Sequence, residues 1–193
     1  ALELAGITTN TLSPPGGEIL RDSSGKPTGI LIDNAMDLVT KVIPPYDEKE
    51  LMQAIEIASN HLISLGITSV HDAGVSAREH RIYRALADKE ELLVRLYGMI
   101  SSTDSELSTI LLEGPVTDEN DLYSARSVKV YTDGALGSRG AALLQPYSDR
   151  PDHTGLLLTS KQTLRDILED AVLSGFQVAI HAIGDKGNQL ALD

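Results

Sequence analysis

Residues 47–74, DEKELMQAIEIASNHLISLGITSVHDAG, decide the class of fold, because a helical pattern in this stretch is followed at once by a strand pattern. Apolar residues recur at helical spacing over most of the stretch. Asp47 precedes them as a helix N-cap and Gly66 follows them as a helix stop. The β-branched run Ile67–His71 then predicts a short strand. The stretch therefore predicts one helix–strand unit of an α/β protein.

The same alternation continues to the end of the chain. Further strands are predicted over 93–100, 127–132 and 176–181, and further helices over 77–88, 104–112, 160–174 and from 185 onward. A long loop is predicted over 133–155. Alternating helices and strands favour a parallel sheet with helices packed outside it. Four strands fit a small open sheet or about half of an eight-stranded barrel, and periodicity does not choose between them.

The first 46 residues have a different pattern. Two short apolar runs, at 18–22 and 28–32, flank the polar residues 23–27, which predicts a β-hairpin. We therefore expect two parts, an irregular hairpin-containing segment over 1–46 and an α/β part over 47–193.

Composition excludes several classes of function. The chain of 193 residues has no Cys, which excludes disulfides, thiolate metal sites and a Cys nucleophile. A formal net charge of −12 disfavours nucleic-acid binding. No segment is long and apolar enough to span a membrane, and the N-terminus is unlike a signal peptide, so we expect a cytoplasmic protein. Assembly into a homo-oligomer is left open.

Lys129 is the first candidate for chemistry. Strand alternation places it on the opposite face from Val128 and Val130. A Lys on a packed face tends to lose its charge, and the neutral amine then forms a Schiff base or adds carbon dioxide to become a metal-bridging carbamate. The alternatives are a structural ion pair with Asp133 or Asp72 and an edge position with the ammonium group in water.

Polar residues also end the other predicted strands. His181 closes an apolar strand, where its imidazole either binds a metal ion or bonds a neighbouring loop. His71 and Asp72 end the first strand of the α/β part, where they contact substrate or cap the next helix. In parallel α/β folds, ligands bind at the carboxyl ends of strands. These residues are therefore candidates for one shared site.

The loop that begins Asp133-Gly134-Ala135-Leu136-Gly137-Ser138-Arg139-Gly140 is rich in small residues. Glycine permits close approach of a ligand to the backbone, and Arg139 is suited to bind a carboxylate. Asp133 and Arg139 are therefore candidate substrate contacts. The loop lacks the Gly-Lys-Ser/Thr ending of a phosphate-binding loop, and the chain contains no Gly-x-Ser-x-Gly nucleophile motif.

Three segments, 66–74, 128–143 and 178–185, resemble the signatures of amidohydrolase family 3, the YtcJ-like or N-substituted formamide deformylase-like branch of the amidohydrolases. The resemblance implies a partial (β/α)8 TIM barrel containing about strands 2–5, with the hairpin segment as an insertion. It also implies one or two divalent metal ions, with zinc expected. By the same resemblance Lys129, as a carboxylated bridging ligand, and His181 are the catalytic, metal-binding residues. The implied substrate is a small molecule with an amide, formamide or cyclic amide bond.

The chain also departs from the family pattern. It contains no His-x-His pair, and no counterparts of the later His and Asp ligands follow His181. We therefore expect an internal fragment with two of the metal ligands, inactive by itself. The alternatives are a non-catalytic interaction module that needs a partner chain and, third, a Schiff-base enzyme that uses Lys129.

Overall fold

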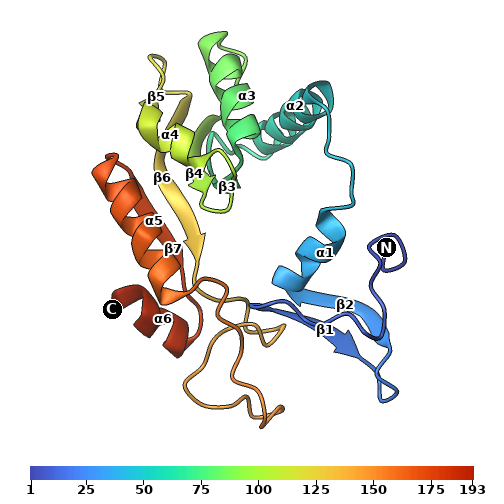
Figure 1. Cartoon of the computed structure of the whole chain (residues 1–193). Coiled ribbons are helices and arrows are strands. Elements are labelled where there is room, and N and C mark those ends of the chain that lie inside the picture. The colour runs from blue at the N-terminus through green and yellow to red at the C-terminus, as the bar shows by residue number, and fades with distance from the viewer. The chain divides into compact units, whose positions relative to one another are not determined.

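The computed structural model describes all residues, 1–193, as a mixed α/β chain (Figure 1). Its N-terminal elements are strands β1 (Gly17–Arg21) and β2 (Pro27–Asp33), a 3-10 turn (Asn34–Met36) and the short helix α1 (Asp37–Thr40). The alternating part contains α2 (Glu48–Ser64), β3 (Ser69–Val75), α3 (Ala77–Asp88), β4 (Arg95–Ser101), α4 (Leu107–Glu113), β5 (Val116–Thr117), β6 (Tyr123–Tyr131), α5 (Lys161–Leu173), β7 (Gln177–His181) and α6 (Asp185–Leu192).

Five strands form one sheet in the order β3-β4-β6-β5, and β7 also pairs with β6. The β3–β4 and β4–β6 pairs are parallel, as alternation with helices predicted. The two-residue strand β5 pairs antiparallel with β6 and was not predicted, because so short a segment has no detectable periodicity. The predicted parallel α/β sheet is thus confirmed, with one short antiparallel strand added.

Helices α2 and α3 begin at reciprocal capping boxes. The Asp47 side chain accepts a hydrogen bond from the Glu50 backbone N–H, and the Glu50 side chain accepts one from the Asp47 N–H. Ser76 and Glu79 make the same exchange at α3. Each box satisfies two N–H groups that a helix start otherwise leaves without partners.

The predicted hairpin is confirmed. β1 and β2 pair antiparallel with Gly17 opposite Asp33, and Figure 1 shows them as adjacent blue arrows. The turn is held by Asp22, whose Oδ1 accepts hydrogen bonds from the N–H groups of Ser24 and Lys26. This is the local side-chain bonding by which Asp favours turns over regular structure.

The chain forms two compact units, each with its own apolar core. The first unit contains Ala1–Pro45, Tyr131–Leu164 and Ile180–Asp193, and the second contains Tyr46–Val130 and Arg165–Ala179. A small cluster of Ile7, Ile19 and Ala35 forms the core of the first unit. The second has a larger aliphatic core against the sheet, which includes Val75, Ile100 and Val128. None of the helices is long and apolar enough to cross a membrane.

Two strands are longer than predicted. β3 continues to Val75, so His71 and Asp72 lie inside the strand rather than at its end. β6 begins at Tyr123 rather than Ser127. Arg126 of β6 is the extra residue of a bulge, because Gly98 and Met99 of β4 pair with Ala125 and Ser127 on either side of it. The alternation of buried and exposed residues shifts there, which hides the earlier half of β6 from a strict two-residue pattern.

Candidate functional site

Asp133 is the anchor of the first unit. Its side chain is fully buried. Oδ2 accepts hydrogen bonds from the backbone N–H groups of Ala142 (2.8 Å) and Gly184 (2.7 Å), and Oδ1 accepts one from that of Ile183 (2.9 Å). A buried carboxylate needs such donors to offset its loss of hydration. Asp133 thus joins the glycine-rich loop to the segment that follows β7, and its expected contact with substrate stays a prediction.

His181 is the last residue of β7, as predicted. Its carbonyl accepts hydrogen bonds from the Thr132 N–H (2.9 Å) and from Thr132 Oγ1 (2.7 Å), so one residue holds the backbone at the end of the strand through two bonds. The imidazole lies beside Tyr131, with ring centroids 5.2 Å apart, and is partly exposed. A ring nitrogen that is reachable from solvent and set on a fixed backbone suits a metal ligand or a proton carrier.

Asp33, which sequence reasoning missed, belongs to the same unit. Its carboxylate lies against the glycine-rich loop: a Cβ built on Gly134 would lie 2.6 Å from Asp33 Oδ1, and one on Gly140 would lie 3.1 Å from Asp33 Cγ. Asp33 Oδ2 is buried and has no hydrogen-bond partner. Burial raises the pKa of Asp33, the charge of Asp133 raises it further, and His181 acts in the opposite direction.

The backbone of Asp33 is also unusual. Its φ of 50° and ψ of −127° lie in a region that favours glycine.

One signal in the sequence points to the contact between Asp33 and the glycine-rich loop. Gly134 and Gly140 do not have positive φ, so they serve close approach rather than backbone conformation. The sequence shows these two glycines but not the side chain, a hundred residues earlier, that lies against them.

Lys129 lies in β6, in the second unit, opposite Ser101 of β4. Val128 and Val130 are fully buried and Lys129 is partly exposed, so the predicted alternation of faces is confirmed. Burial lowers the pKa of the Lys129 amine. Lys129 and His181 belong to different units, and their convergence on one metal ion stays a prediction.

His71 and Asp72 do not cap the following helix, because Ser76 does. The exposed His71 ring lies beside Tyr97, with centroids 5.1 Å apart. Asp72 Oδ2 accepts a hydrogen bond of 2.9 Å from the Tyr83 hydroxyl. Asp72 is thus joined to α3, whereas His71 faces solvent.

Arg139 already binds a carboxylate of its own loop. Its Nε lies 3.1 Å from Asp149 Oδ2, and both side chains are largely exposed. Arg139 has a φ of 60°, which places it at a tight turn. Asp149 occupies the Nε and Nη2 donors of Arg139, and the predicted substrate contact of Arg139 stays a prediction.

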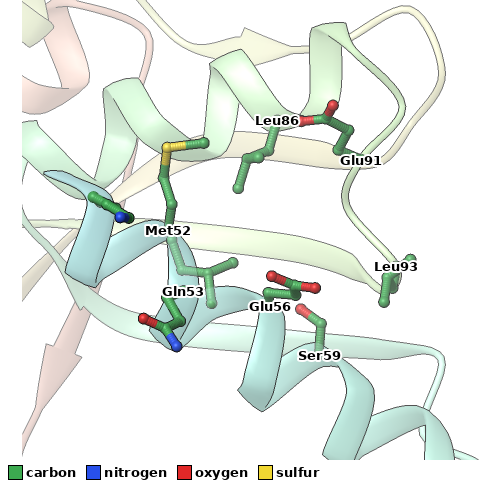
Figure 2. Close-up of a pocket in the computed structure, with 9 residues that line it drawn as sticks. Met52, Gln53, Glu56, Ser59, Leu86, Glu91 and Leu93 are labelled. Carbon is green, nitrogen blue, oxygen red and sulfur yellow. The ribbon is translucent and has the colours of Figure 1, made fainter.

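A hollow of about 830 Å³ lies elsewhere, in the second unit. Figure 2 shows Met52 and Glu56 of α2 on one side of it and Leu86 of α3 on the other. Leu93, which also lines it, precedes β4, so the hollow lies toward the amino end of that strand. Parallel α/β folds bind ligands at the opposite ends of their strands, so this hollow is not the candidate site.

The side chains present fit only part of a metal site. No group of three or more His, Asp or Glu side chains is arranged to hold a metal ion. The His181 imidazole and the unpartnered Asp33 oxygen are the types of donor that divalent metals use, but catalytic zinc ordinarily takes three protein ligands. These residues alone therefore do not complete a catalytic metal centre.

The structure of the chain is similar to those of solved metal-dependent hydrolases. A crystal structure of an uncharacterized metal-dependent hydrolase from Pyrococcus horikoshii OT3 matches all of this chain with a TM-score of 0.75 and 30% sequence identity, and 38% of that protein is covered. The fold is thus of the metal-dependent hydrolase type. More specifically, the chain belongs to the amidohydrolase family, whose pattern it matches over residues 1–193.

Three relatives match the chain over its whole length. Protein LONG AFTER FAR-RED 3 of Arabidopsis thaliana is 36% identical, and YtcJ of Bacillus subtilis (strain 168) and the N-substituted formamide deformylase of Arthrobacter pascens are each 32% identical. The chain spans only 35% of the length of the first and 37% of the other two. The family resemblance of the sequence motifs is confirmed, and the match lies within one part of longer proteins.

Proposed function

We propose that the full-length protein containing these residues is a metal-dependent hydrolase that cleaves a non-peptide C–N bond in an amide, formamide or cyclic amide. The main support is the family match over residues 1–193. A relative that carries the name N-substituted formamide deformylase matches the same residues and supports the choice of bond. The proposed architecture is part of a (β/α)8 barrel, with residues 1–46 as an insertion and 47–193 as the barrel part.

Lys129 and His181 are the proposed metal ligands. His181 ends β7 on a backbone that Thr132 fixes, so its ring has a defined position. The lowered pKa of Lys129 favours the neutral amine, which is the form that reacts with carbon dioxide to give a carbamate. The remaining ligands would come from segments beyond these residues. Zinc, when bound, would lower the pKa of a water molecule and polarise the substrate carbonyl.

The surrounding residues have distinct proposed roles. Asp133 positions the segment after His181 through the Ile183 and Gly184 N–H groups. His71, which faces solvent, is the proposed substrate contact on β3. Asp72 and Arg139 are further proposed substrate contacts, held in place by their bonds to Tyr83 and Asp149.

The test uses the full-length gene product, stripped with a chelator and reloaded with zinc. Hydrolysis is measured with and without metal for N-methylformamide, which gives methylamine and formate, for acetamide, which gives ammonia and acetate, and for 2-pyrrolidinone, whose ring opens to 4-aminobutanoate. We expect zinc-dependent hydrolysis of one of these three classes of amide. His181→Asn should abolish it, whereas His61→Asn, which alters an exposed His on α2, should not. Absence of turnover with all three substrates in the metal-loaded protein would exclude the proposed bond type.

A second candidate function is a non-catalytic module that needs a partner chain. It is favoured by the incomplete ligand set and by β3, which lies at an edge of the sheet and has one strand neighbour. Edge strands offer unpaired backbone groups to another chain. A gene product of these residues alone that forms a stable complex without binding zinc would favour this alternative.

A further inference from the structure

We propose that Tyr131 is a substrate-binding residue beside His181, and that its ring packs against a planar apolar substituent of the bound amide. The choice of an amide rests on the proposed function. The place of the ring rests only on the structure of the first unit.

The first observation is the position of Tyr131 in its strand. It is the last residue of β6 and is 37% exposed, whereas Val130 and Thr132 on either side of it are fully buried. In parallel α/β folds, ligands bind at the carboxyl ends of the strands. A molecule arriving from solvent can therefore reach the Tyr131 ring at the end of the strand where a ligand is expected.

The second observation is the direct contact between Tyr131 and His181. The two ring centroids are 5.2 Å apart and the ring planes are tilted by 45°. The His181 imidazole is itself partly exposed at the end of β7. A molecule held by this imidazole, directly or through a metal ion, would lie next to the Tyr131 ring.

The third observation is that both rings are attached to fixed backbone. The Tyr131 carbonyl accepts a hydrogen bond of 2.7 Å from Thr159 Oγ1. The His181 carbonyl accepts two hydrogen bonds from Thr132, the residue that follows Tyr131. Because the two backbones are held in this way, the ring is in place before a ligand arrives, and binding loses little conformational entropy there.

The chemistry of the ring indicates the kind of substituent. A tyrosine side chain gives a large, rigid and apolar contact surface with few rotatable bonds. Such a surface packs best against another planar or apolar group, in offset or tilted arrangements. An amide that has a phenyl group on its nitrogen or on its carbonyl carbon offers this group close to the bond that is cleaved.

The experiment compares amides that differ only in this substituent. N-phenylformamide is paired with N-methylformamide, and benzamide with acetamide, so both sides of the amide bond are covered. Binding to the zinc-loaded full-length protein is measured by ligand-observed NMR before hydrolysis is detectable, and hydrolysis is measured separately. The wild-type protein should prefer the phenyl compound of at least one pair by roughly tenfold or more.

Tyr131→Ala should reduce this preference by roughly three- to tenfold, because the contact between the rings is lost. Tyr131→Phe, which keeps the ring, should retain the preference. Tyr46→Ala is the matched control, since it makes the same change at a tyrosine that is 69% exposed in the second unit. Thermal melting and metal analysis of each variant check its fold and its zinc content.

An unchanged phenyl preference in Tyr131→Ala would overturn the inference, and so would a wild-type protein without this preference in either pair. Loss of zinc from Tyr131→Ala with the preference unchanged in the zinc-loaded remainder would mean that the ring only positions His181, and this result also overturns the inference. Failure of the proposed function looks different. The phenyl preference would then depend on Tyr131 as expected, but none of the four amides would be hydrolysed.

Discussion

The carboxylate of Asp33 occupies the space that a side chain on Gly134 would need, since the three atoms nearest to a Cβ built on Gly134 all belong to Asp33. The two residues come from different segments, the end of β2 and the loop after β6. Glu18 of β1 adds a second link between the same segments, because both of its carboxylate oxygens bind Arg150 at 2.7 and 2.9 Å. The hairpin is therefore part of the candidate site and not a separate surface element.

Gly134→Ala should destabilise the protein by about 2 kcal/mol, because the added methyl group overlaps the Asp33 carboxylate. Chemical denaturation measures the free energy of unfolding. The loss should shrink by at least about 1 kcal/mol in an Asp33→Gly background, where the overlapping atoms are absent. Gly137→Ala is the matched control in the same loop, since a Cβ there meets nothing within 4 Å. Equal losses at both glycines would contradict the contact.

Asp33→Gly alone should raise the free energy of unfolding by roughly 1–3 kcal/mol. The change removes the strain of a positive φ and also removes a buried oxygen without a partner. Thermal and urea melting of the variant measure the gain, with Asp37→Gly as a comparison that should lose stability in a helix. Destabilisation by Asp33→Gly would mean that the carboxylate supports the fold.

Asp133→Ala should reduce the free energy of unfolding by about 3 kcal/mol, because three backbone N–H groups lose a charged acceptor. Gly187 makes the site sensitive to size as well, since a Cβ there would lie 2.6 Å from Asp133 Oδ2. Asp149→Ala, which breaks the exposed pair with Arg139, should cost no more than about 1 kcal/mol. Similar losses for the two variants would remove Asp133 from its anchoring role.

His80 should make stability depend on pH. The residue is almost fully buried, with Nδ1 2.8 Å from the Tyr123 hydroxyl, and burial lowers its pKa to about 4, helped by the positive charge of Arg84. Because its ordinary pKa is 6.5, the unfolded chain takes up a proton first as the pH falls. The stability that depends on neutral His80 is thus complete above pH 6.5 and is lost progressively down to about pH 4.

The full loss over this interval is about 3 kcal/mol. Urea unfolding at several pH values measures it, and the slope in His80→Gln gives the contribution of the carboxyl groups that titrate in the same interval. We expect a clearly steeper decline in the wild-type protein. Parallel curves for the two proteins would show that His80 is protonated as readily in the folded state as in the unfolded chain.

Lys129→Gln should remove a carbamate and weaken zinc binding of the full-length protein by roughly tenfold or more. Carbon-13 bicarbonate added to the wild-type protein should give a carbamate NMR signal that is absent from Lys129→Gln. Lys41→Gln is the matched control on an exposed residue. If the wild-type protein gave no carbamate signal, or if Lys129→Gln bound zinc as tightly as the wild-type protein, Lys129 would not be a carboxylated zinc ligand.

Much of the α/β part was determined by local sequence. Asp47 and Ser76 cap α2 and α3 through contacts only three residues away, and Gly66 ends the α2 turn with a φ of 77°. Helical periodicity and β-branched runs likewise depend on nearest neighbours, so they are readable without a fold. His181 at the end of β7 was predicted for the same reason.

The structural role of each polar residue was decided by tertiary structure alone. Asp133 became an anchor because its donors come from Ala142 and Gly184, which only folding brings near it. Asp33 acquired its buried acceptor because the hairpin meets two glycines of a distant loop. Burial and hydrogen bonding depend on residues far apart in the chain. The sequence by itself therefore determined the elements and the family, and the packing of those elements determined the role of each carboxylate.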